Sequence, residues 1–365
     1  ILSPGIDKSK CKLKKLLQKK SKIIYTDLDV FKSFYKNKCI TITGTNGKST
    51  TCQLLYDILN EQGYDVKLAG NIGYPILSIK NIKPESLFVI EASSYQLDYS
   101  KIFKSEYSAI LNIKPDHLER HKTFRKYVEA KFKLIKNQEP TSIIFLNKFD
   151  ENISNFLEKN NFKNKIIKVN TRLSKKLISK FKNKYFSSLS NQENLSFVLK
   201  IIERFRINKK LLIKTISNFK GLKFRQQIIY NKNNIQIIND SKSTSYSSSL
   251  EMLKTSKNIY WLIGGIPKAG DRFKLPKIYH KNISGYIFGK NTKKFFYDLN
   301  KKIKIKRFPN LKNALNQIYK DIKIDHSNTK TILFSPAAAS FDNFKNFEDR
   351  GQYFNKIIRE YFNGK

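Results

Sequence analysis

The sequence predicts an α/β protein with two domains, each built on a largely parallel sheet. Short apolar runs alternate with helical segments through most of the chain, which is typical of parallel strands joined by crossover helices. A glycine-rich loop follows the first clear run. The pattern then shifts near Gly221, where a second series of strands and helices begins.

The first series starts near residue 38, after a mixed segment that predicts no clear element. Its expected strands are residues 39–42, 65–68, 87–90, 109–113, 143–146 and 166–169. Its expected helices are residues 49–61, 123–137, 191–204 and 209–219. Strands of this length, separated by helices, favour a sheet whose strands all run in one direction.

The second series opens with an expected hairpin, residues 224–230 and 235–238, turning at Asn233-Asn234. Strands are then expected at residues 259–263, 286–288 and 331–334, with helices between them and a closing helix through residues 353–362. The sequence contains no internal repeat and no long linker of low complexity.

Composition indicates a globular chain and argues against several other classes. The 365 residues are 40% hydrophobic and 13% aromatic, and no apolar run approaches the roughly 18 residues that a membrane helix needs. Cys11, Cys39 and Cys52 lack metal-site spacing and favour free thiols in a cytoplasmic protein. The net charge of +42 raises the alternative of nucleic-acid binding. Lysine is spread along the whole chain and arginine is scarce, which disfavours that alternative.

The loop of residues 44–50 has the composition of a phosphate-binding loop. It reads Gly44-Thr45-Asn46-Gly47-Lys48-Ser49-Thr50 and lies between an expected strand and an expected helix. Backbone N–H groups at such a helix start face an anion, the lysine reaches the β- and γ-phosphates, and the hydroxyl groups bind Mg²⁺. The first domain is therefore expected to resemble a P-loop ATPase, although this loop is shorter than the usual motif.

Two further strand ends of the first domain carry candidate metal ligands. Glu91 follows an apolar strand, so its carboxylate is expected beside the loop at the carboxyl edge of the sheet. His117 and His121 are four residues apart, but the acid between them is not in the position that a zinc-protease helix requires. We therefore expect a single functional histidine, His117, near the metal and phosphate site.

Polar clusters also follow three strands of the second domain. They are residues 239–244, Gly264-Gly265 with Lys268 and Asp271, and residues 335–342. Each cluster alone is weak evidence, but their repetition at successive strand ends predicts a ligand site there.

Taken together, these motifs resemble the Mur ligase family over nearly the whole chain. The matching segments are residues 44–50, 70–73, 91–97, 116–120, 130–131, 221–225, 239–242, 264–268 and 335–350. The Asp240-Ser241-Lys242 triplet and the last segment resemble the members that add D-glutamate. The resemblance implies that UDP-N-acetylmuramoyl-L-alanine is activated by ATP as an acyl phosphate and coupled to D-glutamate in peptidoglycan synthesis. It also implies a Rossmann-like C-terminal domain and a cytoplasmic monomer that binds neither nucleic acid nor membrane.

The resemblance assigns roles to individual residues. Residues 44–50 would bind ATP, with Arg225 and Asp240 facing the nucleotide or the intermediate. One Mg²⁺ would be held by Ser49 and Glu91, and a second by His117 and Lys131, the latter as a carbamate. Lys48, His117 and Lys131 would be the catalytic residues. The expected substrate-binding residues are Ser3, Gly5, Asn71, Lys242, Thr244, Lys268, Ser340 and Phe347.

The expected domains are residues 1–26, 27–220 and 221–365. Residues 1–26 resemble only the end of the domain that holds the UDP group in this family, so most of that domain is expected to be absent, in a fragment or in a shortened protein. Phe224, Ser245, Ala338 and Ser190 also depart from the family's usual residues. Two alternatives stay open: a sibling ligase of the Mur or folylpolyglutamate type, and a truncated ATP-binding protein without turnover.

Overall fold

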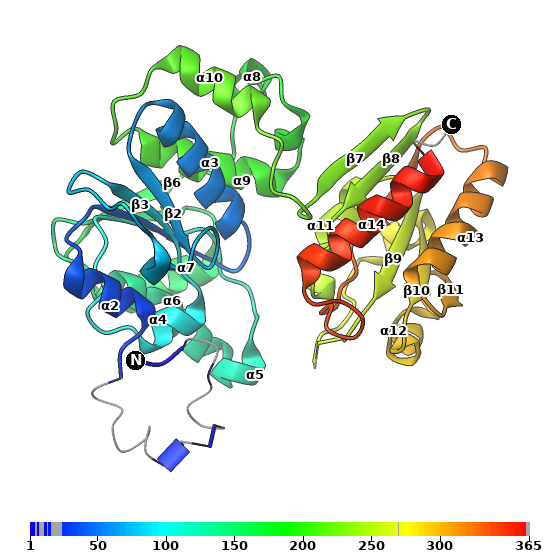
Figure 1. Ribbon diagram of the computed structural model, residues 1–365, viewed down its shortest axis with the longest axis horizontal. Coiled ribbons are helices and arrows are strands. Elements are labelled where there is room, and N and C mark those ends of the chain that lie inside the picture. Colours follow the sequence, from blue (N-terminus) through cyan, green and yellow to red (C-terminus); the bar gives the residue numbers. More distant parts are fainter. Residues whose placement is uncertain (4–5, 7–10, 13, 16–23, 269, 363–365) are drawn as a thin grey trace. The chain divides into compact units, whose positions relative to one another are not determined.

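The chain divides between Phe219 and Lys220 into two compact units (Figure 1). The computed structural model describes residues 1–3, 6, 11–12, 14–15, 24–268 and 270–362. Within this described part, no helix is both long enough and apolar enough to cross a membrane.

Six parallel strands form the sheet of the first unit, in the order β2-β3-β1-β4-β5-β6. They are β1 Cys39–Thr43, β2 Val66–Gly70, β3 Leu87–Glu91, β4 Tyr107–Ile110, β5 Ile143–Asn147 and β6 Lys165–Val169. The side chains of Ile40 and Ile42 in β1 belong to the core on one face of the sheet, and that of Cys39 belongs to the core on the other face. Burial of both faces explains why the central strands are continuous apolar runs in the sequence.

Helices cover both faces of this sheet (Figure 1). On one face lie α3 Lys48–Glu61, α9 Leu189–Ile202 and α10 Lys209–Asn218. On the other lie α2 Asp27–Phe34, α4 Ser94–Tyr99, α6 Phe124–Lys136 and α7 Glu151–Glu158. The remaining helical segments are α5 Leu118–His121, α8 Lys175–Lys180, η2 Ile76–Ser78 and η3 Lys184–Ser187.

The second unit has a mixed sheet in the order β11-β10-β9-β12-β8-β7. Its strands are β7 Gln227–Lys232, β8 Ile235–Asn239, β9 Ile259–Gly264, β10 Ile283–Phe288, β11 Lys304–Phe308 and β12 Lys330–Phe334. Only the edge strand β7 is antiparallel to its neighbour. The β7–β8 turn uses Asn233 and Asn234, whose φ angles of 50° and 60° suit a tight hairpin turn.

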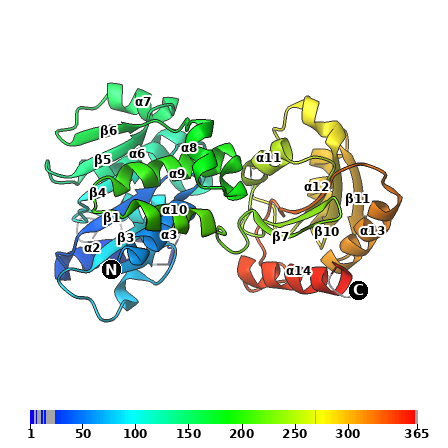
Figure 2. The same ribbon diagram turned by 90° about the horizontal axis from the view of Figure 1, so that it is seen from above.

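Two helices lie on each face of the second sheet (Figure 2). Helices α11 Tyr246–Thr255 and α12 Thr292–Leu299 cover one face, and α13 Leu311–Ile324 and α14 Phe347–Phe362 cover the other. A short 3₁₀ segment, η4 Lys277–Asn282, precedes β10. Strand β9 illustrates the layering, because Trp261 faces the α11 and α12 side while Leu262 faces the α13 and α14 side.

The sequence predicted both sheets and the hairpin correctly, but it missed some elements. Helix α2 lies within the segment that predicted no clear element. Strand β11 is a basic edge strand, Lys304–Phe308, and therefore has no apolar run to reveal it. Helix α14 begins at Phe347 rather than at residue 353, and β4 ends at Ile110 rather than at residue 113.

The buried carboxylate of Asp29 anchors the start of the first unit. Its Oδ2 accepts from the N and Oγ1 of Thr26, which caps α2. Its Oδ1 accepts from Ser100 Oγ and from the backbone N–H groups of residues 101, 102 and 103, at 2.8–3.0 Å. Burial opposes ionisation of Asp29, but the hydrogen bonds from Thr26, Ile102, Lys101 and Ser100 outweigh it and lower its pKa.

We predict that Asp29→Ala lowers the free energy of unfolding by about 2–4 kcal/mol at pH 7, because several buried donors lose their acceptor. A group whose pKa is lowered by folding stabilises above its ordinary value of 3.8 and loses that effect as the pH falls through the folded value. The difference between wild type and variant in urea unfolding should therefore shrink below pH 4. A difference independent of pH would contradict this role.

Candidate active site

The glycine-rich loop joins the end of β1 to the start of α3. Lys48 is the first residue of α3, and its Nζ donates to the carbonyl oxygens of Gly44 and Thr45, at 2.9 Å each. The lysine therefore folds over the loop, where phosphate oxygens would compete for the same ammonium group. Gly47 has a φ of 83°, and an added Cβ would lie 2.0 Å from Oδ1 of Asn194. This position requires glycine.

The loop is fixed from the neighbouring strand by a residue that the sequence analysis did not assign. Asn112 lies just beyond β4, and its Oδ1 accepts from Asn46 N at 2.9 Å. The carbonyl oxygen of Asn112 accepts from Thr45 N, also at 2.9 Å. Asn112 was expected to lie inside a strand, so its role as a loop support was missed. Its position directly after an apolar run was the available signal.

Glu91 lies at the end of β3 with its carboxylate beside the loop, as predicted. It is buried, and its Oε2 accepts from Ser49 Oγ at 2.5 Å. Its Oε1 accepts from Asn71 Nδ2 at 2.9 Å. Glu91, the last residue of β3, lies opposite Ile42, the second-last residue of β1, so the parallel sheet itself brings the carboxylate close to the start of α3. Thr50 is buried in the first turn of α3.

Lys131 lies on α6 with its side chain buried under the loop. Its Nζ donates to Gly44 O at 2.7 Å, so Lys131 and Lys48 share one carbonyl acceptor. Burial lowers the pKa of Lys131 well below its ordinary value of 10.5, and the positive charge of Lys48 lowers it further. A lysine held in this way gives up its proton readily, which makes its amine a nucleophile.

Tyr127, one turn before Lys131 on α6, connects the loop to His117. Its hydroxyl lies 2.9 Å from Thr45 Oγ1. The Nζ of Lys131 lies 4.7 Å from the centre of the Tyr127 ring, and the His117 ring centre lies 6.4 Å from it. Nothing in the sequence singles out Tyr127, because a tyrosine within an amphipathic helix resembles any core residue.

His117 precedes α5 in a left-handed conformation, with a φ of 52°. Its Nδ1 lies 2.9 Å from Tyr95 Oη, and its Nε2 lies 3.3 Å from an oxygen of Asp116. His121 is buried instead, with Nε2 3.0 Å from Ser94 Oγ, and burial lowers its pKa. The two histidines therefore have different surroundings, and the functional role of His117 stays a prediction.

Within the described ranges, no group of three or more histidine, cysteine, aspartate or glutamate side chains could hold a metal ion. The predicted magnesium ligands therefore depend on the hydroxyl of Ser49 and on Lys131 as well as on Glu91 and His117. Hydroxyl and carboxylate oxygens are ligands that Mg²⁺ accepts, and the Ser49–Glu91 pair fits it. An amine does not fit Mg²⁺ in this way, so Lys131 would fit only as a carbamate, which carries oxygen atoms.

Arg120 of α5 is hydrogen-bonded to Ile6, which lies near the start of the chain. Its Nη2 donates to Ile6 O at 2.7 Å and to Tyr99 Oη at 2.9 Å. Ser3 O accepts from Ile6 N at 3.0 Å. The predicted residue Gly5 lies outside the described residues.

In the second unit, Asp240 follows β8 and is buried. Its Oδ2 accepts from Ser335 Oγ at 2.8 Å, and its Oδ1 accepts from Gln226 N at 3.1 Å. Burial raises the pKa of Asp240 to about 7, against the opposing effect of these hydrogen bonds and of nearby Arg225. The carboxyl group therefore titrates near neutral pH, where a change of neighbouring charge would alter its protonation.

Lys242 and Phe347, predicted from distant parts of the sequence, are in direct contact. The Nζ of Lys242 lies 3.9 Å from the centre of the Phe347 ring, a cation–π contact. Arg350, which the sequence analysis gave no role, organises this region. It is buried and donates to Ser241 O at 2.6 Å, to Ser241 Oγ at 3.1 Å and to Gly264 O at 3.4 Å. Burial lowers its pKa to about 10.

The remaining predicted residues lie at three neighbouring strand ends of the second sheet. Thr244 is exposed and directly precedes the N-cap residue of α11. Lys268 lies on the loop after β9, and its carbonyl oxygen accepts from Lys294 Nζ at 3.1 Å. Ser340 is buried after β12, and its carbonyl oxygen accepts from the N–H groups of Asn343 and Phe344.

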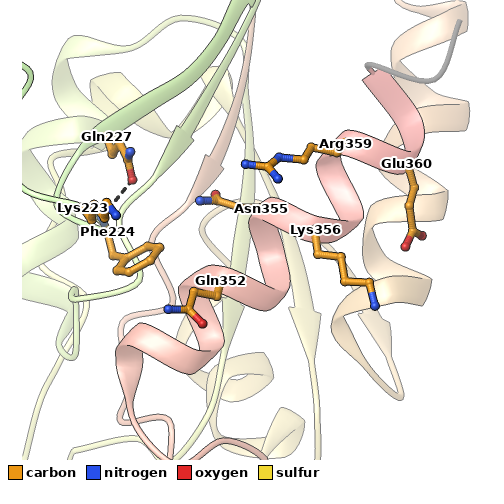
Figure 3. A pocket seen from close by; sticks show the side chains of 8 residues that line it. All are labelled: Lys223, Phe224, Gln227, Gln352, Asn355, Lys356, Arg359 and Glu360. Atoms are coloured by element: carbon orange, nitrogen blue, oxygen red, sulfur yellow. Dashed lines mark hydrogen bonds between the residues drawn. The ribbon is translucent and has the colours of Figure 1, made fainter.

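A hollow of about 550 Å³ in the second unit contains none of the predicted site residues (Figure 3). It is lined by Lys223, Phe224, Gln227, Gln352, Asn355, Lys356, Arg359 and Glu360. Basic side chains are spread over the whole of this +42 chain, so their presence here does not assign a ligand. The ring of Phe224 packs against Gly351 on α14, where an added Cβ would lie 2.3 Å from it.

The sequence of the chain is similar to that of a protein family and of several named proteins. The Mur ligase middle domain family matches residues 42–216. The UDP-N-acetylmuramoylalanine–D-glutamate ligase of Rickettsia prowazekii (strain Madrid E) is 36% identical, over 93% of this chain and 80% of that protein. The ligase of the same name from Buchnera aphidicola subsp. Baizongia pistaciae (strain Bp) is 34% identical, over 99% of this chain and 83% of that protein.

Solved structures share the fold at low sequence identity. The MurF ligase from Thermotoga maritima in complex with ADP has a TM-score of 0.65 and 14% identity, over 94% of this chain and 84% of that chain. E. coli FolC in complex with ADP has a TM-score of 0.61 and 12% identity, over 95% of this chain and 98% of that chain.

The phosphate loop, the paired α/β units and these similarities define a ligase of the Mur type. The chain belongs to the Mur ligase family, and within it to the UDP-N-acetylmuramoylalanine–D-glutamate ligases.

We predict that Gly47→Ala weakens ATP binding at least ~10-fold, because the new methyl group would overlap the amide of the buried Asn194 side chain, so that Asn194 or the loop must move. Isothermal titration with ATP measures the change. Gly63→Ala is the matched control, since Gly63 has a similar φ of 85° but no atom within 4 Å of an added Cβ. Equal affinities in the two variants would refute the steric argument.

Proposed function

We propose that this chain adds D-glutamate to UDP-N-acetylmuramoyl-L-alanine at the expense of ATP, as part of peptidoglycan synthesis. The observation that carries the proposal is the group formed by Lys48, Lys131 and the Ser49–Glu91 pair around the Gly44 loop. It unites a phosphate-binding lysine, an oxygen pair suited to Mg²⁺ and a lysine of lowered pKa. The named relatives, 34–36% identical, support the choice of substrates.

ATP would bind with its phosphates at the loop. The N–H groups at the start of α3 and the ammonium group of Lys48 supply positive charge, and Gly47 keeps the backbone close to the anion. Arg225 and Asp240 are our candidates for further contacts with the nucleotide. Their closeness is supported by the effect of Arg225 on the pKa of Asp240.

Ser49 and Glu91 would hold one Mg²⁺, and His117 with a carbamylated Lys131 would hold a second. A carbamate forms when a neutral amine attacks CO₂: the new N–C bond leaves two carboxylate oxygens, and one proton is released. The lowered pKa of Lys131 favours the neutral amine, and the negative product would also relieve the repulsion from Lys48. Bound magnesium would supply Lewis-acid stabilisation of charge on the phosphoryl oxygens.

The reaction would proceed in two steps. The carboxylate of the L-alanyl group attacks the γ-phosphorus, the new O–P bond forms as the β–γ bridge breaks, and ADP leaves. The amine of D-glutamate then attacks the acyl carbon, an amide bond forms, and inorganic phosphate leaves with the electron pair while the amine loses a proton. Lys48 stabilises negative charge in the first step.

D-Glutamate would bind at the strand ends of the second unit. Lys268 offers a cation to one of its carboxylates and Ser340 a hydroxyl donor. Lys242, Thr244 and Phe347 would complete this surface, while Ser3, Gly5 and Asn71 would contact the first substrate. We further propose that the enzyme works in the cytoplasm as a monomer, as expected from its family.

We predict ADP release that depends on both UDP-N-acetylmuramoyl-L-alanine and D-glutamate, with little turnover when other amino acids replace D-glutamate. Lys48→Ala should lower kcat/KM by roughly 10²–10³-fold, since it removes a charge that acts on the transferring phosphate. A coupled assay for ADP measures both effects. ATP turnover independent of D-glutamate, or near-full activity in Lys48→Ala, would overturn the proposal. Equal turnover with another acidic amino acid would instead favour a sibling ligase.

We predict that ¹³C-bicarbonate gives a carbamate signal in the NMR spectrum of the wild type, and that Lys131→Met abolishes the signal together with ligase activity. Methionine keeps the buried aliphatic stem, so the fold is expected to persist. Lys133→Met on the same helix is the control, because Lys133 is partly exposed and paired with Asp98. Persistence of the signal in Lys131→Met would contradict carbamylation of this residue.

A further inference from the structure

We infer that Asp271 is a positioning residue for the acceptor amino acid, because it fastens the loop that carries Lys268 to the start of the helix that follows Thr244. The inference rests on the proposed function, in which these two residues and Ser340 bind D-glutamate. Three strand-end segments supply the three side chains. Their spacing therefore depends on what holds the segments together.

One end of the β9 loop is joined to the segment of Ser340. Ile266 N donates to Ala339 O at 2.8 Å, and Ala339 N donates to Ile266 O at 2.9 Å. This bridge places residues 266 and 339 side by side in antiparallel fashion. Lys268 lies two residues after one partner, and Ser340 directly follows the other. These two backbone hydrogen bonds therefore hold the two segments at a fixed spacing.

The other end of the loop is joined to α11 by a side chain. Asp271 Oδ2 accepts from Tyr246 N at 2.6 Å. Tyr246 is the first residue of α11, and its N–H is one of the helix-start donors that have no partner within the helix. A carboxylate there also gains from the positive end of the helix dipole. Within the loop, Asp271 N donates to Lys268 O at 3.3 Å, so the same residue contacts both the Lys268 backbone and the helix.

The helix start to which Asp271 is bound is itself immobilised in the core. The Tyr246 ring is buried and packs edge-on against Phe273 and Phe295. Its hydroxyl donates to Asp298 at 3.3 Å. The packing of the Tyr246 ring holds the start of α11 in place. The hydrogen bond from Tyr246 N to Asp271 therefore holds the loop in place as well.

With the hydrogen bonds of Asp271, each of the three segments is hydrogen-bonded to another. Ser340 and Lys268 are related by the backbone bridge, and Lys268 and Thr244 are related through Asp271. Both features lie within the second unit, whereas the phosphate loop belongs to the first. Loss of Asp271 should therefore affect the affinity for D-glutamate selectively.

The test compares Asp271→Ala, Asp271→Asn and Asp298→Ala. We expect Asp271→Ala to raise the KM for D-glutamate ~10-fold or more, since small displacements of binding groups are costly, while the KM values for ATP and the UDP substrate stay within ~2-fold. Asp271→Asn keeps an oxygen that accepts from Tyr246 N, so it should return the KM for D-glutamate to within ~3-fold of wild type. Asp298→Ala removes the other carboxylate that Tyr246 contacts, but it removes no hydrogen bond to the loop. The KM values of this variant should therefore match those of the wild type.

An unchanged KM for D-glutamate in Asp271→Ala, or equal increases for all three substrates, would overturn the inference and leave the proposed function intact. Equal effects of Asp271→Ala and Asp298→Ala would also overturn it, because they would indicate general weakening of the Tyr246 packing. A wild-type enzyme without D-glutamate-dependent turnover would overturn the proposed function and the inference together.

Discussion

The first unit's site depends on one carbonyl oxygen, that of Gly44, to which two lysine side chains donate. The loop thereby collects positive charge at the start of α3, where the helix dipole already favours an anion. One of the lysines is fully buried, and its ammonium group is costly to maintain there. A phosphate at the loop and a carbamate on Lys131 would each reduce that cost. The same contact would thus connect nucleotide binding at the loop with the proposed chemistry of the buried amine.

Parallel sheet geometry explains why residues far apart in the sequence meet at the strand ends of each unit. In the first unit, β1 and β3 end within one residue of each other, and Ser49 Oγ lies 2.5 Å from Glu91 Oε2. In the second unit, the ends of β8, β9 and β12 present their polar segments along one edge. The central strands are buried on both faces, so their polar side chains are concentrated at the strand ends.

The second unit is held at that edge by two charged side chains, buried Arg350 and half-buried Asp271. Arg350 donates to the segment after β8 and to the last residue of β9, and Asp271 joins the β9 loop to α11. Each is bonded to backbone groups, so both act on the position of a segment and not on one side chain. Such supports leave little trace in a sequence, because a single arginine or aspartate is usually a solvated residue.

The sequence by itself determined the two α/β units, the phosphate loop and the family, because strand and helix periodicity and the loop's glycines are local properties. It also identified Glu91, His117 and Lys131 as candidates from their motifs. Only the tertiary structure decided which residues meet: that Lys131 shares an acceptor with Lys48, and that Asn112 and Tyr127 support the loop. The reason is physical. Local patterns fix backbone conformation, whereas contacts between strand ends depend on sheet order and register, which no local pattern encodes.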